Sequence, residues 1–265
     1  MDLDLSGRTA LITGSTGGIG YAIARELAVL GATVAVNGRG PERVRASIDR
    51  LSGEVPSARF IAAPGDLSAD AGIGSILASV PDLDILVNNA GIFEPKPFFE
   101  IPDEDWRRFF DVNVLGGVRL ARSYVPGMVA RGWGRVVFIS SESAVQIPVE
   151  MIHYGMTKTA QIAVARGLAE TVAGSGVTVN SVLPGPTASE GVVDFLQKMA
   201  PGGGAADLEA MGRDFIRANR PTSIIGRLSR VEEVANMVAF LCSPAASATT
   251  GAALRVDGGV IRAIL

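Results

Sequence analysis

A serine, a tyrosine and a lysine stand at a spacing that suits acid–base chemistry in the run SSESAVQIPVEMIHYGMTK. Tyr154 and Lys158 are four residues apart, so on a helix they project from the same face, one turn from each other. A positive charge beside a phenol stabilises the phenolate, and it moves a pKa of about 10 toward the range of efficient proton exchange. Ser141 follows a strand-forming run at 135–140, from which its hydroxyl can reach a substrate oxygen beside the tyrosine. The three residues predict acid–base catalysis at that oxygen.

A glycine-rich stretch, TGSTGGIG at 13–20, lies between an apolar run and a helical pattern near the start of the chain. Glycines permit a tight turn and let backbone N–H groups approach a pyrophosphate, which the positive end of the following helix also attracts. A tight strand-to-helix corner with no ligand would look the same. The position of the stretch in the first β-α unit favours a dinucleotide.

Short β-branched runs alternate with helical patterns along the whole chain. Several of the runs are apolar throughout, as is typical of strands buried on both faces of a parallel sheet. The predicted strands are 9–13, 33–37, 59–62, 85–88, 136–140, 177–182 and 253–256. Between the first two, a helix is predicted over Ile19–Leu30, closed by Gly31. The alternation predicts an α/β fold with one doubly wound parallel sheet of about seven strands and helices on both faces.

No repeat or linker divides the chain, so we expect residues 1–265 to form a single domain. The connection at 186–225 is unusually long, and it holds helix-like stretches at 191–199 and 207–219, hinged by the Pro-Gly-Gly-Gly run at 201–204. A connection of this length beside a site is typical of a lid over the substrate.

Composition excludes several classes of function. The chain is 48% hydrophobic with a net charge of −3 and no basic run, so we expect neither nucleic acid nor a membrane surface as partner. The start lacks the features of a signal peptide, and no segment approaches the roughly 20 apolar residues of a membrane helix, which favours a cytoplasmic protein. A single cysteine, Cys242, excludes an internal disulfide and is expected in the core. One histidine cannot build a typical zinc site, so no metal is expected.

Six motifs in order and spacing resemble the short-chain dehydrogenase/reductase family over essentially the whole chain. They are TGSTGGIG, the NNAG run at 88–91, GDLS with Asp66, DVNVLGG with Asn113, the Ser141 and YGMTK set, and Pro184-Gly185 with the closing VDGG. The resemblance implies a Rossmann domain that transfers hydride between a nicotinamide and a carbonyl or alcohol carbon. It also implies a catalytic set of Asn113, Ser141, Tyr154 and Lys158.

The resemblance also implies where the cofactor lies. Asp66 would meet the adenine, and Lys158 would bind the nicotinamide ribose, while Asn113 would hold a water that links the lysine to solvent. Family members often place threonine five residues beyond the proline, where this chain has Ser189, with Thr187 two residues earlier, and either hydroxyl is a candidate. The expected cofactor-binding residues are Gly14, Ser15, Thr16, Gly18, Ile19, Gly20, Asn37, Arg39, Asp66, Leu67, Asn89, Ala90, Gly91, Tyr154, Lys158, Pro184, Gly185, Thr187 and Ser189.

The end of the second predicted strand bears on the choice of nicotinamide. NAD enzymes usually place a carboxylate there, whereas this chain reads Asn37-Gly38-Arg39, with Glu42 as the nearest acid downstream. Gly38 is expected to leave room, Arg39 to offer a planar fork to a 2′-phosphate, and Asn37 to donate a further hydrogen bond. The sequence therefore predicts NADP(H) over NAD(H). An Arg39 that stacks on adenine or lies in solvent is the alternative.

The substrate is less constrained than the reaction. Residues expected around it are mainly apolar: Ile92, Phe93, Glu94, Glu142, Ser143, Val149, Met151, Val192, Val193, Phe195, Leu196 and Met199. This mixture favours a ketone, with a 3-oxoacyl group as one candidate. Oxidation of a secondary alcohol or diol by the same residues is the alternative.

Two functions of other classes compete with the reductase. His153 with Ser141 and an acid such as Glu142 or Glu150 suggests a serine hydrolase triad, but no G-x-S-x-G elbow is present. The second alternative is a nucleotide-binding regulatory protein that has lost catalysis. The intact Ser-Tyr-Lys-Asn set disfavours this alternative. The resemblance also implies a homotetramer, for which the apolar stretches 112–120, 162–169 and 260–265 offer surfaces.

Overall fold

Seven parallel strands form the centre of the part of the chain that this computed structural model describes, residues 1–193 and 208–264. The strands are β1 (Thr9–Ile12), β2 (Thr33–Gly38), β3 (Phe60–Pro64), β4 (Ile85–Asn88), β5 (Gly134–Ile139), β6 (Val177–Pro184) and β7 (Ala253–Val256). Their order across the sheet is β3-β2-β1-β4-β5-β6-β7. The chain thus winds outward first on one side of β1 and then on the other, which confirms the predicted doubly wound sheet.

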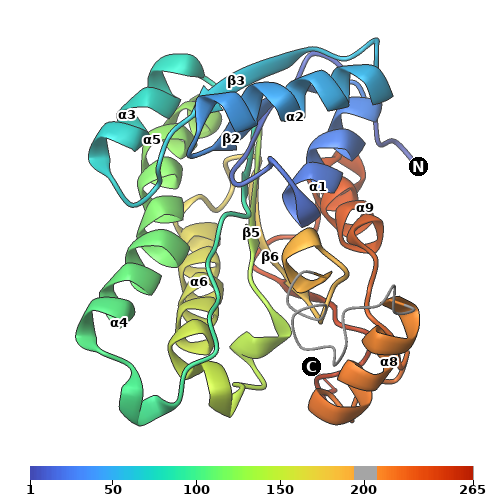
Figure 1. The fold of residues 1–265 in the computed structure, drawn as a ribbon. Coiled ribbons are helices and arrows are strands. Elements are labelled where there is room, and N and C mark those ends of the chain that lie inside the picture. The colour runs from blue at the N-terminus through green and yellow to red at the C-terminus, as the bar shows by residue number, and fades with distance from the viewer. Residues whose placement is uncertain (194–207, 265) are drawn as a thin grey trace.

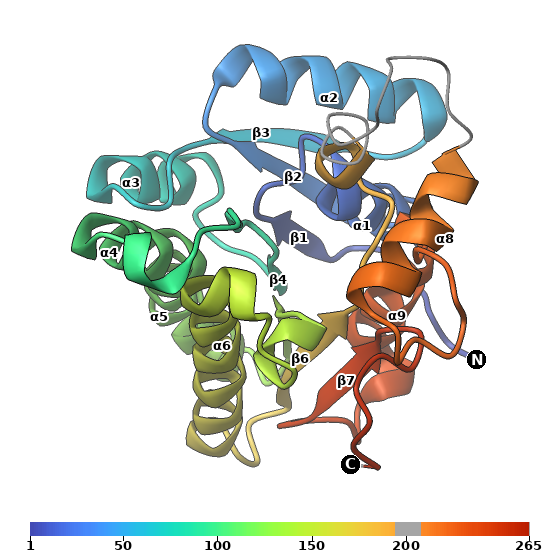
Figure 2. The ribbon, with the colours of Figure 1, turned by 60° about the horizontal axis from the view of Figure 1, so that its bottom comes forward.

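Helices cover both faces of the sheet (Figures 1 and 2). One layer holds α1 (Gly18–Val29), α2 (Pro41–Glu54) and α9 (Val231–Cys242), and the other holds α3 (Asp70–Ser79), α5 (Gly116–Ala130) and α6 (Ile152–Thr171). Side chains alternate between these layers along each strand, so Ile12 enters the first core and Leu11 the second. A strand with both faces buried needs apolar residues at every position, which explains the continuous apolar runs of the sequence.

The strand ends that bear the site are surrounded by short helical turns. They are η1 (Phe98–Glu100), η3 (Glu142–Ala144) and η4 (Val149–Met151), while η5 (Pro244–Ala246) follows α9. Before α5, helix α4 (Asp103–Phe110) runs directly into a π-helical turn, η2 (Asp111–Leu115). A π turn holds one more residue than an α turn, and here it directs the buried Asn113 inward.

Predicted and observed elements differ only at their ends. One such difference is at β6, which continues to Pro184 because this residue pairs with Val256 of β7. In the predicted lid, α8 (Leu208–Asn219) matches the second helix, and residues 190–193 begin the first. The rest of that first helix, the hinge at 201–204, and Phe195, Leu196 and Met199 lie outside the described residues.

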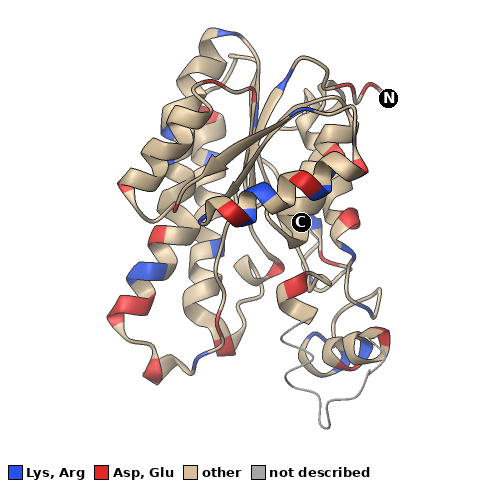
Figure 3. Cartoon of the chain, turned by 45° about the horizontal axis from the view of Figure 1, so that its top comes forward, with Lys and Arg blue, Asp and Glu red and all other residues tan. Residues whose placement is uncertain are grey.

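Charged side chains are distributed over the surface, with Lys and Arg interspersed among Asp and Glu (Figure 3). Cys242 is fully buried, as predicted, and burial raises the pKa of its thiol to about 12. Within the described residues, no helix is both long and apolar enough to span a bilayer.

Candidate active site

The site lies at the carboxyl ends of the central strands, where the strand order reverses between β1 and β4, the usual place for a ligand in a doubly wound sheet. A cavity of about 340 Å³ opens there. Ten of the predicted site residues line it: Ile19, Asn89, Gly91, Ser141, Tyr154, Lys158, Pro184, Gly185, Thr187 and Ser189. These residues come from segments that are far apart in sequence, so the fold brings residues predicted from separate motifs together in one pocket.

The glycine-rich turn after β1 is tightly packed. Gly14 and Gly18 have φ angles of 62° and 55°, a conformation that other residues rarely adopt. A Cβ at Gly20 would lie 2.4 Å from the Gly14 carbonyl oxygen and 2.5 Å from Nδ2 of Asn89. Helix α1 begins beside this turn with Gly17 as its N-cap and with no side-chain hydrogen bond to its first N–H groups. No N-cap side chain takes these donors, so they are available to an anion.

The beginning of the lid lies over this turn. A Cβ at Gly17 would come within 2.6 Å of Oε2 of Glu190, and one at Gly18 within 3.3 Å of Cβ of Ser189. The amino end of α1 therefore already has a carboxylate against it, so the place suits an anion such as a pyrophosphate. Of the two hydroxyl candidates for the cofactor, Thr187 donates to the Gly185 carbonyl oxygen at 2.8 Å. Ser189 is the one that lies against the glycine turn.

Asn37 and Ser15 are placed differently from the prediction of direct cofactor contacts through their side chains. The Asn37 amide donates to the Ala63 and Gly65 carbonyl oxygens at 2.8 and 3.3 Å, and its Oδ1 accepts from the Gly14 N–H at 3.1 Å. The Ser15 hydroxyl donates to the Ile12 carbonyl oxygen at 2.7 Å. Both side chains are buried and committed to the turn itself, so they position the backbone that faces the cleft.

Arg39 and Asp66 stand at the end expected for the adenosine. Arg39 is exposed and makes no hydrogen bond within the described residues. The side chain and N–H of Ser68 lower the Asp66 pKa, and the nearby Arg39 charge lowers it further. The space beside Gly38 is not open, because a Cβ there would lie 2.6 Å from the methyl carbon of Thr16. Leu67 is buried, packed against Gly116 of α5.

Ser141 and Tyr154 meet in the pocket. Ser141 follows β5, and its hydroxyl accepts from the Ser143 N–H at 3.1 Å and donates to the Glu142 carboxylate at 3.2 Å. Burial raises the pKa of Tyr154 to about 12, while its hydrogen bond with Ser141 acts in the opposite direction. We expected Lys158 to lower this pKa, and in this structure its ammonium instead lies 5.5 Å from the ring centroid and bonds elsewhere.

Lys158 is fixed by oxygen acceptors inside the protein. Its ammonium donates to the Ile139 carbonyl oxygen at 2.9 Å and to Oε1 of Gln161 at 3.2 Å. Burial lowers the Lys158 pKa to about 8. The other end of the Gln161 amide donates to the Asn113 carbonyl oxygen at 2.6 Å. One side chain thus links the predicted lysine to the predicted asparagine directly.

The Asn113 side chain faces the loop after β4. Its Oδ1 accepts from the Ile92 N–H at 2.8 Å, and its amide donates to the Ile92 carbonyl oxygen and the Thr157 hydroxyl, each at 3.0 Å. A Cβ at Gly91 would lie 3.3 Å from both Asn113 Oδ1 and Lys158 Nζ. The Ala90 N–H is held at 2.9 Å by the Thr13 hydroxyl. These bonds fix the β4 loop as a wall of the cleft.

Residues 14–261 match a family profile described as enoyl-(acyl carrier protein) reductase, within the short-chain dehydrogenases. The chain belongs to the short-chain dehydrogenase/reductase family. It is therefore an NAD(P)-dependent oxidoreductase that acts on CH–OH and C=O groups. This membership confirms the resemblance drawn from the six motifs.

Relatives cover the chain from end to end. The uncharacterised oxidoreductase YvaG of Bacillus subtilis is 50% identical over 264 residues, which cover 100% of both chains. The 3-oxoacyl-(acyl-carrier-protein) reductase FabG of Aquifex aeolicus is 34% identical, over 98% of this chain and 100% of its own. The structure of L-sorbose reductase from Gluconobacter frateurii, complexed with NADPH and L-sorbose, superposes with a TM-score of 0.92 at 32% identity, over 100% of both chains.

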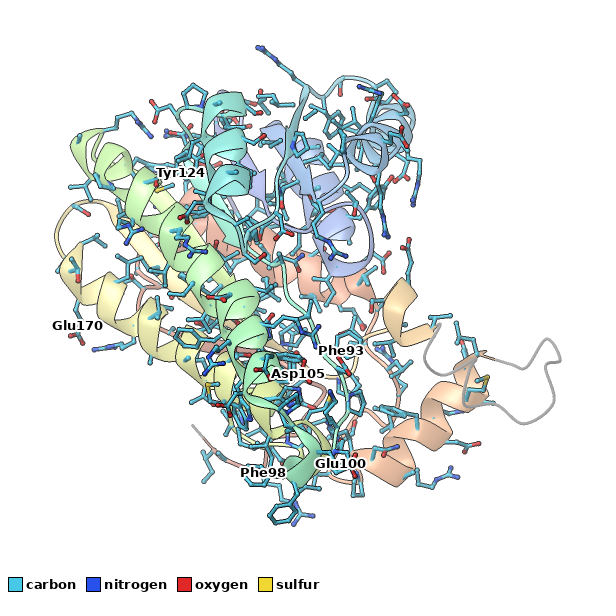
Figure 4. The ribbon with its side chains drawn as sticks, turned by 60° about the vertical axis from the view of Figure 1, so that its left-hand side comes forward. Phe93, Phe98, Glu100, Asp105, Tyr124 and Glu170 are labelled. Atoms are coloured by element: carbon cyan, nitrogen blue, oxygen red, sulfur yellow. The ribbon has the colours of Figure 1, made fainter. Side chains whose placement is uncertain are left out.

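The wall of this pocket is mainly apolar, as expected. Phe93, Met151 and Val192 line it as predicted, and the Phe93 ring meets that of Tyr154 edge-on at 6.4 Å. Figure 4 shows Phe93 on the side of the body that faces α8. Among the predicted wall residues, Ile92, Glu94, Val149 and Val193 do not line the cavity. Residues that line it without having been expected there include Pro95, Phe215, Asn219 and Arg220.

His153 excludes the hydrolase interpretation. The imidazole is fully buried, 4.0 Å between centroids from the Phe109 ring and 5.9 Å from that of Trp106. Neither ring nitrogen has a hydrogen-bond partner within the described residues, so no Ser-His pair exists. Burial lowers the His153 pKa, and the side chain packs behind the tyrosine as a neutral ring.

The glycine turn yields a direct test. Gly20→Ala places a methyl group against backbone at 2.4 Å, so we expect α1 to shift, with a loss of about 1–3 kcal/mol in the free energy of unfolding. Dinucleotide affinity, measured by fluorescence titration, should fall with it. Gly40→Ala is the matched control, because a Cβ there meets nothing within 4 Å. Equal stability and affinity of the two variants would contradict the packing described.

Proposed function

We propose that this chain transfers hydride between NADP(H) and a carbonyl or secondary alcohol, working chiefly as a ketone reductase. The observation that carries the proposal is the convergence of Ser141, Tyr154 and Lys158 on one pocket, which also opens onto the amino end of α1. A nicotinamide nucleotide bound in this cleft supplies or accepts the hydride. The protein's own side chains donate the proton and bind the reacting oxygen.

Tyr154 is the proposed proton donor to the reduced oxygen, and Ser141 is the proposed hydrogen-bonding partner of the same oxygen. With a pKa raised by burial, the phenol is protonated at neutral pH and holds the proton that reduction requires. Gln161 accepts a hydrogen bond from Lys158 and donates one to the Asn113 carbonyl oxygen, so it holds the ammonium in place beside the pocket. In the oxidative direction the same groups take the proton, which is the alternative activity.

The proposed choice of NADP(H) rests on Arg39. Its exposed guanidinium follows β2 beside Asp66, and no carboxylate stands at the end of the strand to bind a ribose diol. A guanidinium free of internal hydrogen bonds can offer both its N–H pairs to a 2′-phosphate. The NADPH complex of L-sorbose reductase, a structural neighbour over the whole chain, supports the same choice.

The proposed substrates are ketones, 3-oxoacyl groups among them. The similarity to FabG supports a 3-oxoacyl group, and the similarity to L-sorbose reductase supports a smaller hydroxylated ketone. Apolar Phe93, Met151 and Phe215 suit a carbon chain, whereas Asn219 suits a hydroxyl group.

We expect Tyr154→Phe to lower kcat for ketone reduction by about 10³-fold, since positioned acid–base groups contribute 10²–10⁴-fold. NADPH oxidation at 340 nm, run with a panel of ketones that includes 3-oxoacyl thioesters, measures the change. NADPH affinity should stay within about twofold. Tyr124→Phe is the control, because it removes a buried hydroxyl bonded to the Val80 carbonyl oxygen, away from the pocket. Near-wild-type turnover by Tyr154→Phe would refute the mechanism.

Arg39→Ala should weaken NADPH binding by about 10- to 100-fold and leave NADH binding nearly unchanged, because a hydrogen bond to a charged group contributes about 1.5–3 kcal/mol. Dissociation constants for both nucleotides check this. Arg59→Ala is matched in charge, since Arg59 is exposed beside the amino end of β3, whereas Arg39 follows the carboxyl end of β2. If the two substitutions changed the NADPH dissociation constant equally, the proposed role of Arg39 would be refuted.

We also propose that the chain is one domain and assembles as a homotetramer. Val260 and Ile261 of the tail are buried in their own chain, so this part of the predicted interface caps the core, whereas Ile264 is 94% exposed. Light scattering at micromolar concentration should give four times the 27.4 kDa of one chain. A monomeric mass would contradict the assembly.

A further inference from the structure

A buried ion pair in the pocket wall joins the lid to the residue that follows Ser141. Nε of Arg220 donates to Oε1 of Glu142 at 2.7 Å, and the two residues are only 9% and 2% exposed. Glu142 lies in η3, while Arg220 comes directly after α8, so the pair closes a link across 78 residues. The sequence places Glu142 near the substrate, but it does not indicate Arg220 or the pairing of the two.

We propose that Arg220 is a positioning residue for the proposed acid–base chemistry, holding the Glu142 carboxylate against Ser141 and balancing its charge beside Tyr154. The inference rests on the proposed function. Arg220 need not touch the substrate for this role, because it acts through Glu142.

The hydrogen bonds of Glu142 carry the first half of the argument. While Oε1 takes Arg220, Oε2 accepts from the Ser141 hydroxyl at 3.2 Å and makes a very short bond to the Ser143 hydroxyl. Together with the Ser143 N–H, which donates to Ser141 Oγ at 3.1 Å, these contacts set the direction of the serine hydroxyl. If the carboxylate moved away, the Ser143 N–H would still hold Ser141 Oγ, but the hydroxyl proton would lose its acceptor and its fixed direction.

The position of α8 carries the second half. The Arg220 N–H donates to the Ile216 carbonyl oxygen at 2.8 Å, and its Nη1 donates to that of Asn219 at 2.8 Å. Ile216 is buried in a small cluster with Leu228. The guanidinium therefore reaches Glu142 from a backbone that is fixed only when α8 is packed. The packing of α8 and the orientation of the Ser141 hydroxyl are therefore coupled.

Charges around Tyr154 are balanced through the same pair. The polar and charged groups that act on or lie near its hydroxyl are Ser141, Glu142, Lys158 and Arg220, with Glu150 3.6 Å from Nη1 of Arg220. After burial and the Ser141 hydrogen bond, the Glu142 charge raises the Tyr154 pKa and the Arg220 charge lowers it. Removing the charge of Glu142 or of Arg220 leaves the other charge buried without its partner. The two substitutions therefore shift the pKa of the Tyr154 phenol in opposite directions.

The test compares Glu142→Gln with Arg220→Met in the oxidative direction, with NADP⁺ and the alcohol of the best ketone. Oxidation needs the phenolate, whose fraction rises with pH over the whole range below the Tyr154 pKa, so kcat rises with pH there and a change in this pKa displaces the rise along the pH axis. Glu142→Gln should move this rise to lower pH and Arg220→Met to higher pH, each by about one pH unit. The double variant should return it near the wild-type position, and Arg220→Lys should leave it nearly in place with a lower kcat.

Controls separate this inference from the function on which it rests. Glu233→Gln removes a carboxylate from another close Arg ion pair, 2.7 Å from Arg227 and outside the pocket, and should leave the pH profile unchanged. Retained NADP⁺ affinity establishes that each variant is folded. If Arg220→Met does not fold, the shift of Glu142→Gln to lower pH decides alone. Shifts in one direction, or none, in variants that still turn over would overturn the inference and leave the reductase intact. A wild-type protein with no turnover would overturn both.

Discussion

Two asparagine amides hold the turn after β1 from opposite sides, and the site depends on this clamp. Asn37 comes from β2 and bonds the Gly14 N–H, while Asn89 follows β4 and donates to the Thr13 and Gly14 carbonyl oxygens at 2.9 and 3.1 Å. β2 and β4 are the two neighbours of β1, so the clamp closes where the strand order reverses. Without it, buried backbone groups of the turn would lack partners, at a cost of about 1–3 kcal/mol each. With it, the turn is rigid enough for α1 to begin within contact of the sheet.

A few charged groups inside this pocket are buried, and each of these is bonded to other groups of the protein. The Lys158 ammonium is 4% exposed and bonded to two oxygens, and the Glu142 carboxylate is nearly inaccessible and bonded on both oxygens. Buried charges persist only when they are paired or hydrogen-bonded. The apolar remainder of the wall excludes water and strengthens these interactions, so polar and apolar residues serve the same chemistry.

Much of the fold was predictable, because its signals are local. Strands such as β4, buried on both faces, show themselves as apolar runs, and the YGMTK helix shows itself through the spacing of Tyr154 and Lys158. The catalytic candidates were also brought together, since their motifs follow the ends of neighbouring strands. What could not be predicted depends on pairing over long separations. Arg220 meets Glu142 across 78 residues, and no pattern in either segment indicates the other.

Other differences arose from competition for hydrogen bonds. Asn37 had the right chemistry for a phosphate, but its side-chain amide is already bonded to the backbone of Gly14, Ala63 and Gly65. Gln161 looked like an ordinary helix residue three positions after Lys158, yet it connects that lysine with Asn113. Spacing predicts which side chains share a face, whereas the partner that each donor selects is decided by backbone groups that only the folded chain brings near.

The π turn between α4 and α5 has a consequence for how insertions and deletions would act here. Its extra residue puts the two helices out of rotational phase, so α4 and α5 present different faces to the molecule although they run on continuously. Removing one residue from 111–115 would restore a regular helix and turn Asn113 away from Ile92 and Thr157. A fully regular helix here would thus lose the contacts that Asn113 makes with the β4 loop and with α6, and the irregular turn is the part of the helix that provides them.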